Sequence, residues 1–407
     1  MRFISALNPA LMRFCYVLFA VGLVVAAQAQ AQQPVKILFD ATKAETAGNA
    51  DWVIDADVAG SPQRLPTPAQ STVTASTPET YWTGALSAWG IALVKRGYQV
   101  ETLPGSGRIS YGDATNPQDL SAYAAYIVDE PNIRYTPAEK TAILDYVRNG
   151  GGLFMISDHT MSDRNGDGWD SPAIWNDLMA SASPANPFGL TFDLNNLSFT
   201  TGVSTAVAPT DSLLHGPAGN PVAMEYHNGA SLTLSPTTNA SVRGVLFRPS
   251  AAPIGTTGVI VAHARFGRGR VAALGDSSPP DDGTGAPGNT LYNGWSAEAN
   301  GDHARLLLNA TIWLATPTHT ATATHRATEA LLSVYPNPST DAFFISGTVL
   351  PVEIRCYNAV AQEVAVASAP AGVGALRVSA TGLAAGLYLL SLRMPDGQVL
   401  TRRVSRQ

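Results

Sequence analysis

Three short apolar runs in the first half of the chain predict buried strands. They span residues 35–39, 123–128 and 152–156, and each run ends in polar residues. Apolar runs of this length are typical of parallel strands that are covered on both faces. Between them, apolar residues at a spacing of three to four predict a helix over 81–96, and a second helix is predicted over 136–149. This alternation indicates an α/β fold with a doubly wound, mostly parallel sheet.

The second predicted helix carries its own start and stop signals. Thr136, Pro137 and Glu139 fit a capping box, in which Thr caps the first turn, Pro occupies it and Glu reaches back. The glycines at 150–152 then end the helix. We therefore expect this helix to lead directly into the third buried strand.

After Pro187 the pattern changes to alternating stretches rich in Thr, Ser and Asn, which predict a β-rich insertion. Two apolar runs, 258–263 and 271–274, flank an arginine-rich turn and predict a hairpin that returns to the main sheet. A closing helix is expected over 302–315. The α/β domain is thus predicted to span residues 32–315.

The end of the chain has the pattern of a separate unit. Residues 316–330 are mostly Thr, Ala and His, which predicts a linker. Strand patterns with clearly marked turns follow. Residues 331–407 are therefore predicted to form a small all-β sandwich.

The N-terminus has the pattern of a secretory signal peptide. Two arginines precede an apolar run over 14–27, and small residues alternate over 27–31. A basic start, a short apolar stretch and alternating small residues are what a signal peptidase recognises. We expect residues 1–31 to be removed by cleavage after Ala29 or Ala31, and no transmembrane segment in the mature protein.

Charge and cysteine content narrow the classes of function. The net charge is −6, from 25 Lys and Arg against 31 Asp and Glu, and no basic block stands out. Nucleic acid is therefore not expected as a partner. Cys15 lies within the predicted signal peptide, which leaves Cys356 alone in the mature chain. Without an internal disulfide, stability must come from a large core, from metal ions or from both.

Two motifs in the tail point to a known family. The sequence reads VYPNPS at 334–339 and GLAAGLYL at 382–389, and the last strand is basic. This pattern resembles the type IX secretion sorting domain, a small β-sandwich at the C-terminus of proteins exported across the outer membrane. The resemblance implies the type IX secretion machinery as a partner. It also implies a protein that passes through the periplasm and is then secreted or held on the outer-membrane surface. An adhesive sandwich that serves the mature protein is the alternative.

The order of elements in the large domain resembles a second family. Strand, loop and helix follow one another from Lys36 to His159, and the helix after Pro137 leads through three glycines into a strand that ends at Ser157. This order resembles the class I glutamine-amidotransferase-like fold, in the broad group that includes ThuA-like proteins. True amidotransferases carry a nucleophilic Cys after that strand, where this chain reads Ser-Asp-His. Glutamine hydrolysis by a thiol is therefore excluded.

Acidic residues and a His follow the predicted strands. In a doubly wound sheet, ligands bind beyond the carboxyl ends of the strands. Carboxylates held close together repel one another unless a cation or a proton intervenes. We expect a pocket with Asp158, His159 and Glu130 as catalytic residues, and with Asp40 and Asp276 as ligands of a divalent metal. The alternative is that these acids are ordinary loop residues that cap helices.

A run directly after this cluster has the pattern of a calcium loop. Acidic and amide residues alternate from 163 to 167, and Gly168 permits the sharp turn. We expect a structural calcium ion with five ligands: Asp163, Asn165, Asp167, Trp169 and Asp170. Ile174 stands at the twelfth position, where a bidentate Glu is usual, so Asp170 or Asp177 has to replace it. The alternative is a solvated turn held by Asx hydrogen bonds.

Two hypotheses of function follow from these patterns. The first is a metal-dependent hydrolase that acts on an extracellular small molecule or polysaccharide, with calcium as a structural ion and a second divalent metal in the pocket. The second is a non-catalytic, calcium-stabilised module that binds glycans or surface polymers, on which Trp169 and Trp295 would stack. Convergence of the strand-end acids in one cleft would favour the first.

Overall fold

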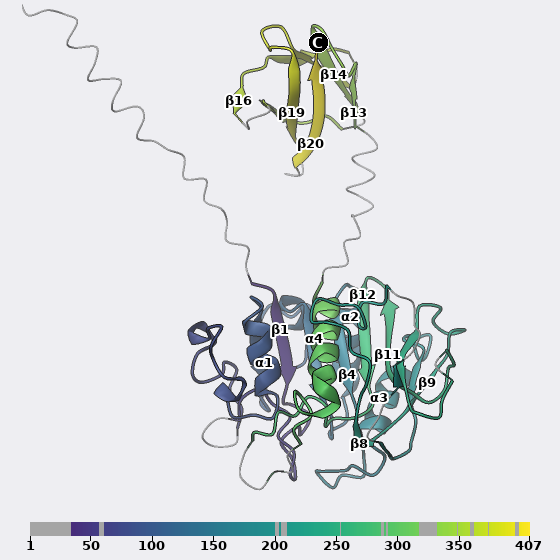
Figure 1. Cartoon of the computed structure of the whole chain (residues 1–407). Coiled ribbons are helices and arrows are strands. Elements are labelled where there is room, and N and C mark those ends of the chain that lie inside the picture. The colour runs from purple at the N-terminus through teal and green to yellow at the C-terminus, as the bar shows by residue number, and fades with distance from the viewer. Residues whose placement is uncertain are drawn as a thin grey trace, which may run out of the picture. The chain divides into compact units, whose positions relative to one another are not determined.

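The fold of the chain is given by a computed structural model. It describes residues 34–56, 61–199, 203–204, 210–252, 254–285, 289, 292–316, 332–347, 349–358, 362–372, 374–394 and 399–407. The predicted signal peptide and all but the first residue of the predicted linker lie outside these ranges. The chain divides into two compact units between Pro317 and Thr318 (Figure 1). Among the described residues, no helix combines the length and apolar character needed to cross a bilayer.

The first unit is built on a ten-stranded sheet. Its order is β2-β1-β3-β4-β12-β11-β10-β7, and β9 and β5 extend it from β11. The first five strands pair in parallel, whereas β11 and the strands beyond it pair antiparallel. The parallel part consists of β1 (Lys36–Asp40), β2 (Gln99–Leu103), β3 (Ala125–Asp129), β4 (Gly152–Ile156) and β12 (Gly269–Leu274). The antiparallel part consists of β5 (Leu190–Phe192), β7 (Val203–Ser204), β9 (Leu232–Leu234), β10 (Arg243–Phe247) and β11 (Val259–Phe266).

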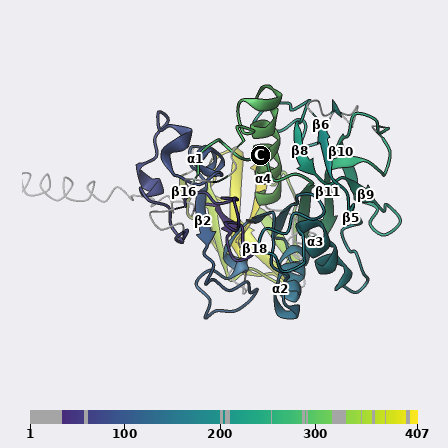
Figure 2. The ribbon, with the colours of Figure 1, turned by 90° about the horizontal axis from the view of Figure 1, so that it is seen from below.

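Helices cover both faces of this sheet, as Figure 2 shows for α1 and α4 on one side and α2 and α3 on the other. Successive residues of β1 point to opposite faces, so Ile37 and Phe39 pack with α1 and α4, whereas Leu38 packs with α2 and α3. The helices are α1 (Ser87–Val94), α2 (Pro137–Arg148), α3 (Ser171–Ala180) and α4 (Asp302–Ala315). The predicted α/β layering with a parallel-rich sheet is therefore confirmed.

The smaller elements lie in the connections of this unit. β6 (Leu197–Phe199) and β8 (Tyr226–Gly229) form a separate two-stranded sheet. The described residues of the first unit also form four short 3-10 helices: η1 (Gln70–Thr72), η2 (Glu79–Tyr81), η3 (Leu120–Ala122) and η4 (Glu298–Gly301).

The capping box predicted for the second helix is present. Thr136 Oγ1 accepts from the backbone N–H of Glu139, and the Glu139 carboxylate accepts from the backbone N–H of Thr136. The chain then turns at Gly150, where φ is +120°. The two hydrogen bonds of the capping box satisfy two backbone N–H groups at the helix start that have no partner within the helix.

The helix predicted over 81–96 is shorter than expected, because α1 begins only at Ser87. The residues before it form a turn that packs on another loop, with the N–H of Ala85 bonded to Asp51 O. Gly84 approaches the carbonyl of Val53 so closely that a Cβ there would lie 2.0 Å from the Val53 oxygen. Backbone contact between distant segments therefore outweighs the helical periodicity of this stretch.

The second unit is an all-β sandwich. One sheet has the order β13-β14-β18-β17 and the other β16-β15-β19-β20, and one apolar core lies between them. Cys356, the free cysteine, is buried in this core. The strands are β13 (Leu332–Tyr335), β14 (Ala342–Gly347), β15 (Glu353–Tyr357), β16 (Glu363–Val364), β17 (Ser368–Pro370), β18 (Ala375–Ser379), β19 (Gly386–Arg393) and β20 (Val399–Arg406).

Candidate functional site

A polar cavity of about 260 Å³ lies at the carboxyl ends of the parallel strands. Asp158 follows β4 on this edge, and Ser277 follows β12. This is where a doubly wound sheet binds its ligands. Its wall consists of Asn49, Trp52, Asp158, His159, Ser162, Arg164, His227, Asn228, Ser277, Ser278 and Tyr292. The pocket expected from the strand ends therefore exists, but only some of the predicted residues line it.

Glu130 lies beneath this wall and is fully buried. Its Oε1 accepts from Ser162 Oγ at 2.6 Å and from Arg164 Nε at 2.5 Å, and its Oε2 accepts from Trp52 Nε1 at 2.6 Å and Ser277 Oγ at 2.8 Å. Burial opposes ionisation, but the charge of Arg164 and these hydrogen bonds outweigh it and hold the pKa of Glu130 below its ordinary value. Four donors thus fix Glu130 as an anion with little capacity for further bonds.

Arg164 is the cation of the site, and the sequence pattern did not single it out. Besides Glu130, its Nη2 lies 3.5 Å from Asp158 Oδ2, and its backbone N–H donates to Asn132 Oδ1. Burial disfavours the charged guanidinium, but the charge of Glu130 outweighs it and raises the pKa of Arg164. Because Arg164 lies in the loop after β4 and not at a strand end, only the fold brings it to the cavity.

Asp158 and His159, which the sequence analysis expected to be catalytic, both line the cavity. Asp158 Oδ2 lies 2.7 Å from Ser162 Oγ, whose one proton is donated to Glu130, and His159 Nε2 lies 3.9 Å from the same Asp158 oxygen. Burial, and next the negative charges of Glu130 and Asp276, raise the pKa of Asp158 well above its ordinary value. The protonated form of Asp158 is therefore favoured relative to that of an ordinary Asp, and this form can act as an acid. His159 Nδ1 lies 2.6 Å from the Thr160 carbonyl, which leaves Nε2 on the side of Asp158.

Asp276 is buried behind the cavity and binds backbone groups. Its Oδ2 accepts from the N–H of His227 at 2.6 Å and its Oδ1 from the N–H of Ser278 at 2.8 Å. Burial raises its pKa. Asp276 therefore holds two loops of the cavity wall in place, which differs from the metal-ligand role predicted for it.

Asp40 does not line the cavity. It forms a separate buried pair with Glu45, and the Thr42 hydroxyl lies 3.0 Å from Asp40 Oδ1. Burial raises the pKa of Asp40, and burial together with the charge of Asp40 raises the pKa of Glu45 well above its ordinary value. Like charges in a dry site share a proton in this way. The expected convergence of Asp40 with the other strand-end acids is therefore not seen.

A group of potential metal ligands lies at the rim of the cavity. One ligand atom from each of Glu225, His227 and Glu298 lies within 4.8 Å of the other two. Among the described residues, this is the group of three His, Cys, Asp or Glu side chains whose ligand atoms lie close enough together to hold one metal ion. His227 Nε2 is 2.9 Å from Glu298 Oε2, and the ring stacks on Tyr292 with centroids 4.7 Å apart. His227 also lines the cavity. Glu225 lies in a loop and Glu298 begins the short helix η4, so neither follows a strand, which is why the strand-end pattern missed them.

The predicted calcium loop is an exposed turn held by its own side chains. Asp163 accepts from the backbone N–H groups of Asp167 and Gly168, and Asp167 accepts from the N–H of Trp169. Asn165 donates from its amide to Asp167 Oδ2 at 3.1 Å. These are the Asx hydrogen bonds of the alternative interpretation.

The residues that were expected to complete this loop have other partners. Asp170 caps α3, with Oδ1 accepting from the N–H of Ala173 and Oδ2 from the N–H of Met161. Asp177 pairs with Lys140 at 2.6 Å. The Trp169 ring lies against the Arg134 guanidinium at 3.8 Å. Asp170 and Asp177 are thus engaged away from the loop.

The tail is the part of the chain that comparison with known proteins identifies. Residues 333–405 match the family described as the secretion system C-terminal sorting domain. This tail is a type IX secretion sorting domain. Its presence supports export of the chain by the type IX system, to the cell surface or the medium.

The other comparisons give distant likenesses. The mmIFT52 N-terminal domain has a TM-score of 0.41 and 16% identity, covering 69% of this chain and 97% of that one. A putative ThuA-like protein from Parabacteroides merdae has a TM-score of 0.34 and 14% identity, covering 70% of this chain and 91% of that one. No curated protein sequence matches the chain.

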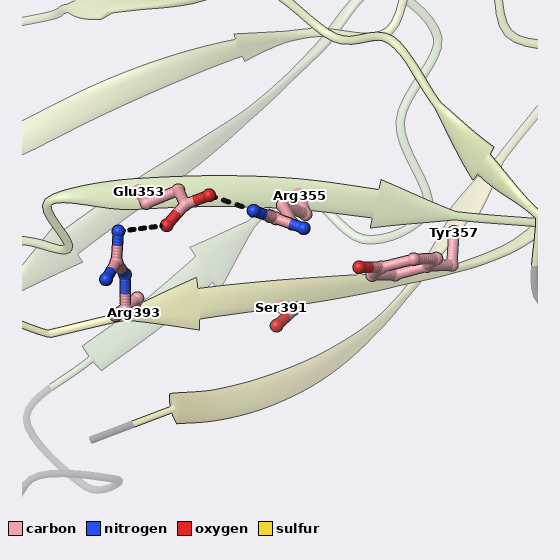
Figure 3. Close-up of a pocket in the computed structure, with 5 residues that line it drawn as sticks. All are labelled: Glu353, Arg355, Tyr357, Ser391 and Arg393. Atoms are coloured by element: carbon pink, nitrogen blue, oxygen red, sulfur yellow. Dashed lines mark hydrogen bonds and ion pairs between the residues drawn. The ribbon is translucent and has the colours of Figure 1, made fainter. Parts of the chain in front are cut away.

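The sorting domain carries a hollow of about 330 Å³ on the face of one sheet (Figure 3). Glu353 forms ion pairs with Arg355 and, across the strand pair, with Arg393. Tyr357 and Ser391 complete the wall. Because the carboxylate of Glu353 serves both guanidinium groups, every charged residue that lines the hollow already has an ion-pair partner within it.

Proposed function

We propose that the first unit is a secreted, metal-dependent hydrolase with its active site in the Asp158 cavity. The observation that carries the proposal is the position of His227, which belongs both to the cavity wall and to the Glu225, His227 and Glu298 group. A metal held there would border the space in which a substrate lies. Export by the sorting domain supports an extracellular substrate.

The donor set of this group fits a first-row divalent metal. Two carboxylates and one imidazole are common ligands of such ions at about 2.0 to 2.2 Å, with positions left open for water and substrate. When bound, the metal would supply a Lewis acid and a water of lowered pKa. Glu225 and Glu298 take the place of Asp40 and Asp276 as proposed ligands, because Asp40 does not line the cavity and Asp276 is bonded to backbone groups.

The cavity residues have separate roles in the proposal. Asp158, whose pKa is raised by burial first, holds the proton that a leaving group takes up. His159 lies beside it and orients or relays that proton. Arg164 faces the cavity with a fixed positive charge that attracts a substrate oxygen and stabilises negative charge on it. Glu130 acts through Arg164 as a positioning residue rather than as a base.

The wall also suits a polar, ring-shaped substrate. Trp52 and Tyr292 line the cavity with aromatic groups, and Ser277 and Ser278 line it as well. Sugars bind in sites of this kind, through ring faces and convergent polar groups. A glycan or a small sugar-like molecule is therefore the proposed substrate class. Trp295, which the sequence offered for stacking, is buried against Trp89 and is not available for it.

We further propose the amidotransferase-like group for the fold and calcium for the exposed loop. Support for the fold comes from the strand order β2-β1-β3-β4 and from the glycine-led entry into β4. Support for calcium comes from Asp163, Asn165 and Asp167, whose oxygens lie on one short turn, and from the positive φ of +88° at Gly168. A calcium ion in this loop would stiffen the rim near Arg164.

The test of the hydrolase proposal combines metal analysis with assays on the mature chain. Wild type, His227→Ala and His215→Ala are dialysed with zinc or manganese and assayed on nitrophenyl esters, phosphates and glycosides. We expect His227→Ala to lose the metal and at least about tenfold of the activity, whereas His215→Ala, which removes an exposed imidazole outside the group, keeps both. Wild type without bound metal and without activity on any of these compounds would overturn the proposal.

A non-catalytic module that binds glycans or surface polymers is the second candidate. It is favoured by the saturation of Glu130, which leaves that carboxylate without a catalytic lone pair. In that case, oligosaccharides would bind to the chain without being cleaved, and His227→Ala would weaken binding only through loss of its ring contact with Tyr292.

A further inference from the structure

A second cavity of about 300 Å³ lies at the opposite edge of the sheet. It is bounded by the β11–β12 hairpin, by the loop that contains His215 and by the last turn of α4. Arg270 lines it near the start of β12, whereas the Asp158 cavity lies beyond the end of that strand. The second cavity is therefore distinct from the site already described.

Two arginines give this cavity a positive charge. Arg265 and Arg270 lie directly opposite one another in the antiparallel register of β11 and β12, so their side chains share one face. Both guanidinium groups approach the Trp313 ring, at 5.9 and 5.0 Å from its centroid. Among the described residues, no carboxylate lies within ion-pair distance of either arginine. Like charges thus adjoin one another without a counter-ion from the described chain.

Arg270 is the more unusual of the two because it is 92% buried. Only 8% of its surface is exposed, and its Nε has no hydrogen-bond partner among the described residues. Burial, and next the charge of Arg265, lower the pKa of Arg270. A buried donor that lacks an acceptor is costly, more so when the group is charged. Its burial is best offset by an acceptor that enters the cavity.

The end of α4 accounts for only part of the arginine's bonding capacity. One Nη1–H of Arg270 donates to the Trp313 carbonyl and so offsets the negative end of the helix dipole. A guanidinium has five N–H donors in a planar fork. The Nε–H of Arg270 and the guanidinium group of Arg265 take no part in this cap. Helix capping therefore explains the position of Arg270 but not the pairing of two arginines.

The rest of the cavity wall is polar and well fixed. Asn309 binds the carbonyls of Leu213 and Gly219 and accepts from the N–H of Ala218, which holds the loop around His215 in place. Ser212 and His215 lie at the mouth and are exposed. Hydroxyl and imidazole N–H groups are donors that complement arginine around an oxyanion.

We propose that this cavity binds a tetrahedral oxyanion, a phosphate or sulfate group, between Arg265 and Arg270. The planar guanidinium fork matches two oxygens of such a group, and charge-assisted hydrogen bonds from it are among the strongest in proteins. The volume exceeds that of a single anion, so the cavity accommodates the free ion or the same group carried by a sugar. Trp313 would then lie beneath the attached ring.

The experiment measures phosphate binding to the mature full-length chain. Thermal melting and titration calorimetry are done in sodium phosphate, in sodium sulfate and in sodium chloride at matched ionic strength. The variant is Arg265→Gln, which alters an exposed side chain and leaves the buried Arg270 in place. The matched control is Arg268→Gln, an exposed arginine at the tip of the same hairpin that does not line the cavity.

We expect phosphate and sulfate to raise the melting temperature more than chloride does, by mass action on the folded state. Arg265→Gln should weaken phosphate affinity about tenfold or more, because a charged hydrogen-bond donor is lost, while Arg268→Gln should bind as wild type does. A shift no larger than that of chloride would overturn the proposal. Equal affinity of both variants would also overturn it, because the anion would then bind elsewhere.

Sodium acetate tests whether the cavity prefers a planar carboxylate to a tetrahedral anion. A larger stabilisation by acetate than by phosphate and sulfate would identify a carboxylate site and overturn the tetrahedral assignment. Glucose 6-phosphate separates the two sources of the group. Binding at least as tight as that of free phosphate supports a sugar-borne ligand, and weaker binding supports the free ion.

Discussion

Arg164 Nε donates to Glu130 Oε1 at 2.5 Å, and this ion pair lies directly beneath the cavity at the end of β3 and β4. Glu130 is buried, so Glu130→Gln leaves the Arg164 charge without its main partner. We expect the free energy of unfolding to fall by about 3 kcal/mol. Urea unfolding of wild type and variant measures the change.

The exposed pair of Arg148 and Asp145 provides the control for that experiment. Arg148→Gln should cost less than about 1 kcal/mol, because solvent screens an exposed ion pair. A Glu130→Gln variant that unfolds as wild type does would contradict the positioning role of Glu130.

Asp158→Asn separates chemistry from stability. The change removes the proton that the proposed acid supplies but keeps the shape and a partner for Ser162. We expect hydrolytic activity to fall about 100-fold or more at neutral pH. In wild type, activity should decline as pH rises through the raised pKa of Asp158, since the acid form is then lost.

The stability of the first unit should also fall as pH rises. Because the folded-state pKa of Asp158 is raised, its stabilising effect is complete below the ordinary Asp value and is lost as pH rises towards the raised value. Asp158→Asn should therefore be at least as stable as wild type at pH 8. A variant that keeps full activity and merely melts earlier would end the active-site proposal.

Asp119 is expected to stabilise the first unit through its charged form. Its carboxylate accepts from Ser110 Oγ, from the backbone N–H groups of Gly112 and Asp113, and from Ser121. Burial opposes ionisation, but these hydrogen bonds, led by those of Ser121 and Ser110, outweigh it and lower the pKa of Asp119 to about 2. Its contribution is present above the ordinary Asp value and is lost as pH falls from about 4 to about 2.

The corresponding variant is Asp119→Ala. We expect a loss of about 1 to 2 kcal/mol at pH 7, which solvent screening keeps below the value for a dry site. The difference between variant and wild type should shrink as pH falls below about 4. Chemical unfolding at several pH values tests this, and a difference that stays constant down to pH 2.5 would contradict the role of the charge.

Calcium should raise the melting temperature of the mature chain if it binds the loop around Asp163. A ligand that binds only the folded state stabilises it by mass action, by about 2.7 kcal/mol at 100 times Kd. Asp163→Ala combined with Asp167→Ala should abolish the calcium shift. Magnesium at equal concentration is the control, because its octahedral preference suits this flexible loop poorly. An unchanged calcium shift in the double variant would refute the loop assignment.

Deletion of the sorting domain should change location without unfolding the first unit. The two units form separate compact clusters, so removal of residues 318–407 should leave a cooperatively folding domain. We expect this shortened chain to accumulate in the periplasm, as cell fractionation would show, while the full chain reaches the surface or the medium. Surface delivery of the shortened chain at normal yield would refute the export role of the tail.

Local patterns predicted those parts of the fold that local physics determines. The capping box at Thr136 is satisfied within four residues, and the apolar stretches within β1, β3 and β4 fit a sheet that is covered on both faces. β2 was not predicted, because its sequence QVETL mixes polar and apolar residues. Its Glu101 is satisfied by Lys36 and Arg64, which the sequence does not place beside it.

The site could be predicted only where it follows a strand directly. Asp158 and His159 reach the cavity because the sheet fixes the end of β4. Arg164 and Glu225 lie in loops and Glu298 begins η4, and the positions of these segments depend on long-range contacts. One such contact is the bond from the N–H of Ala299 to Glu225 Oε1. A pattern based on strand ends has no access to those contacts.

Strand β12 joins the two cavities. Arg270 lies near its start and Asp276 just past its end, six residues apart, which corresponds to about 20 Å in an extended strand. The strand is buried and paired with β4 and β11 along its length, so it is a rigid spacer with a cationic end and an acidic end. Occupancy of one cavity should therefore leave the affinity of the other nearly unchanged, and the two ligands should bind additively rather than cooperatively.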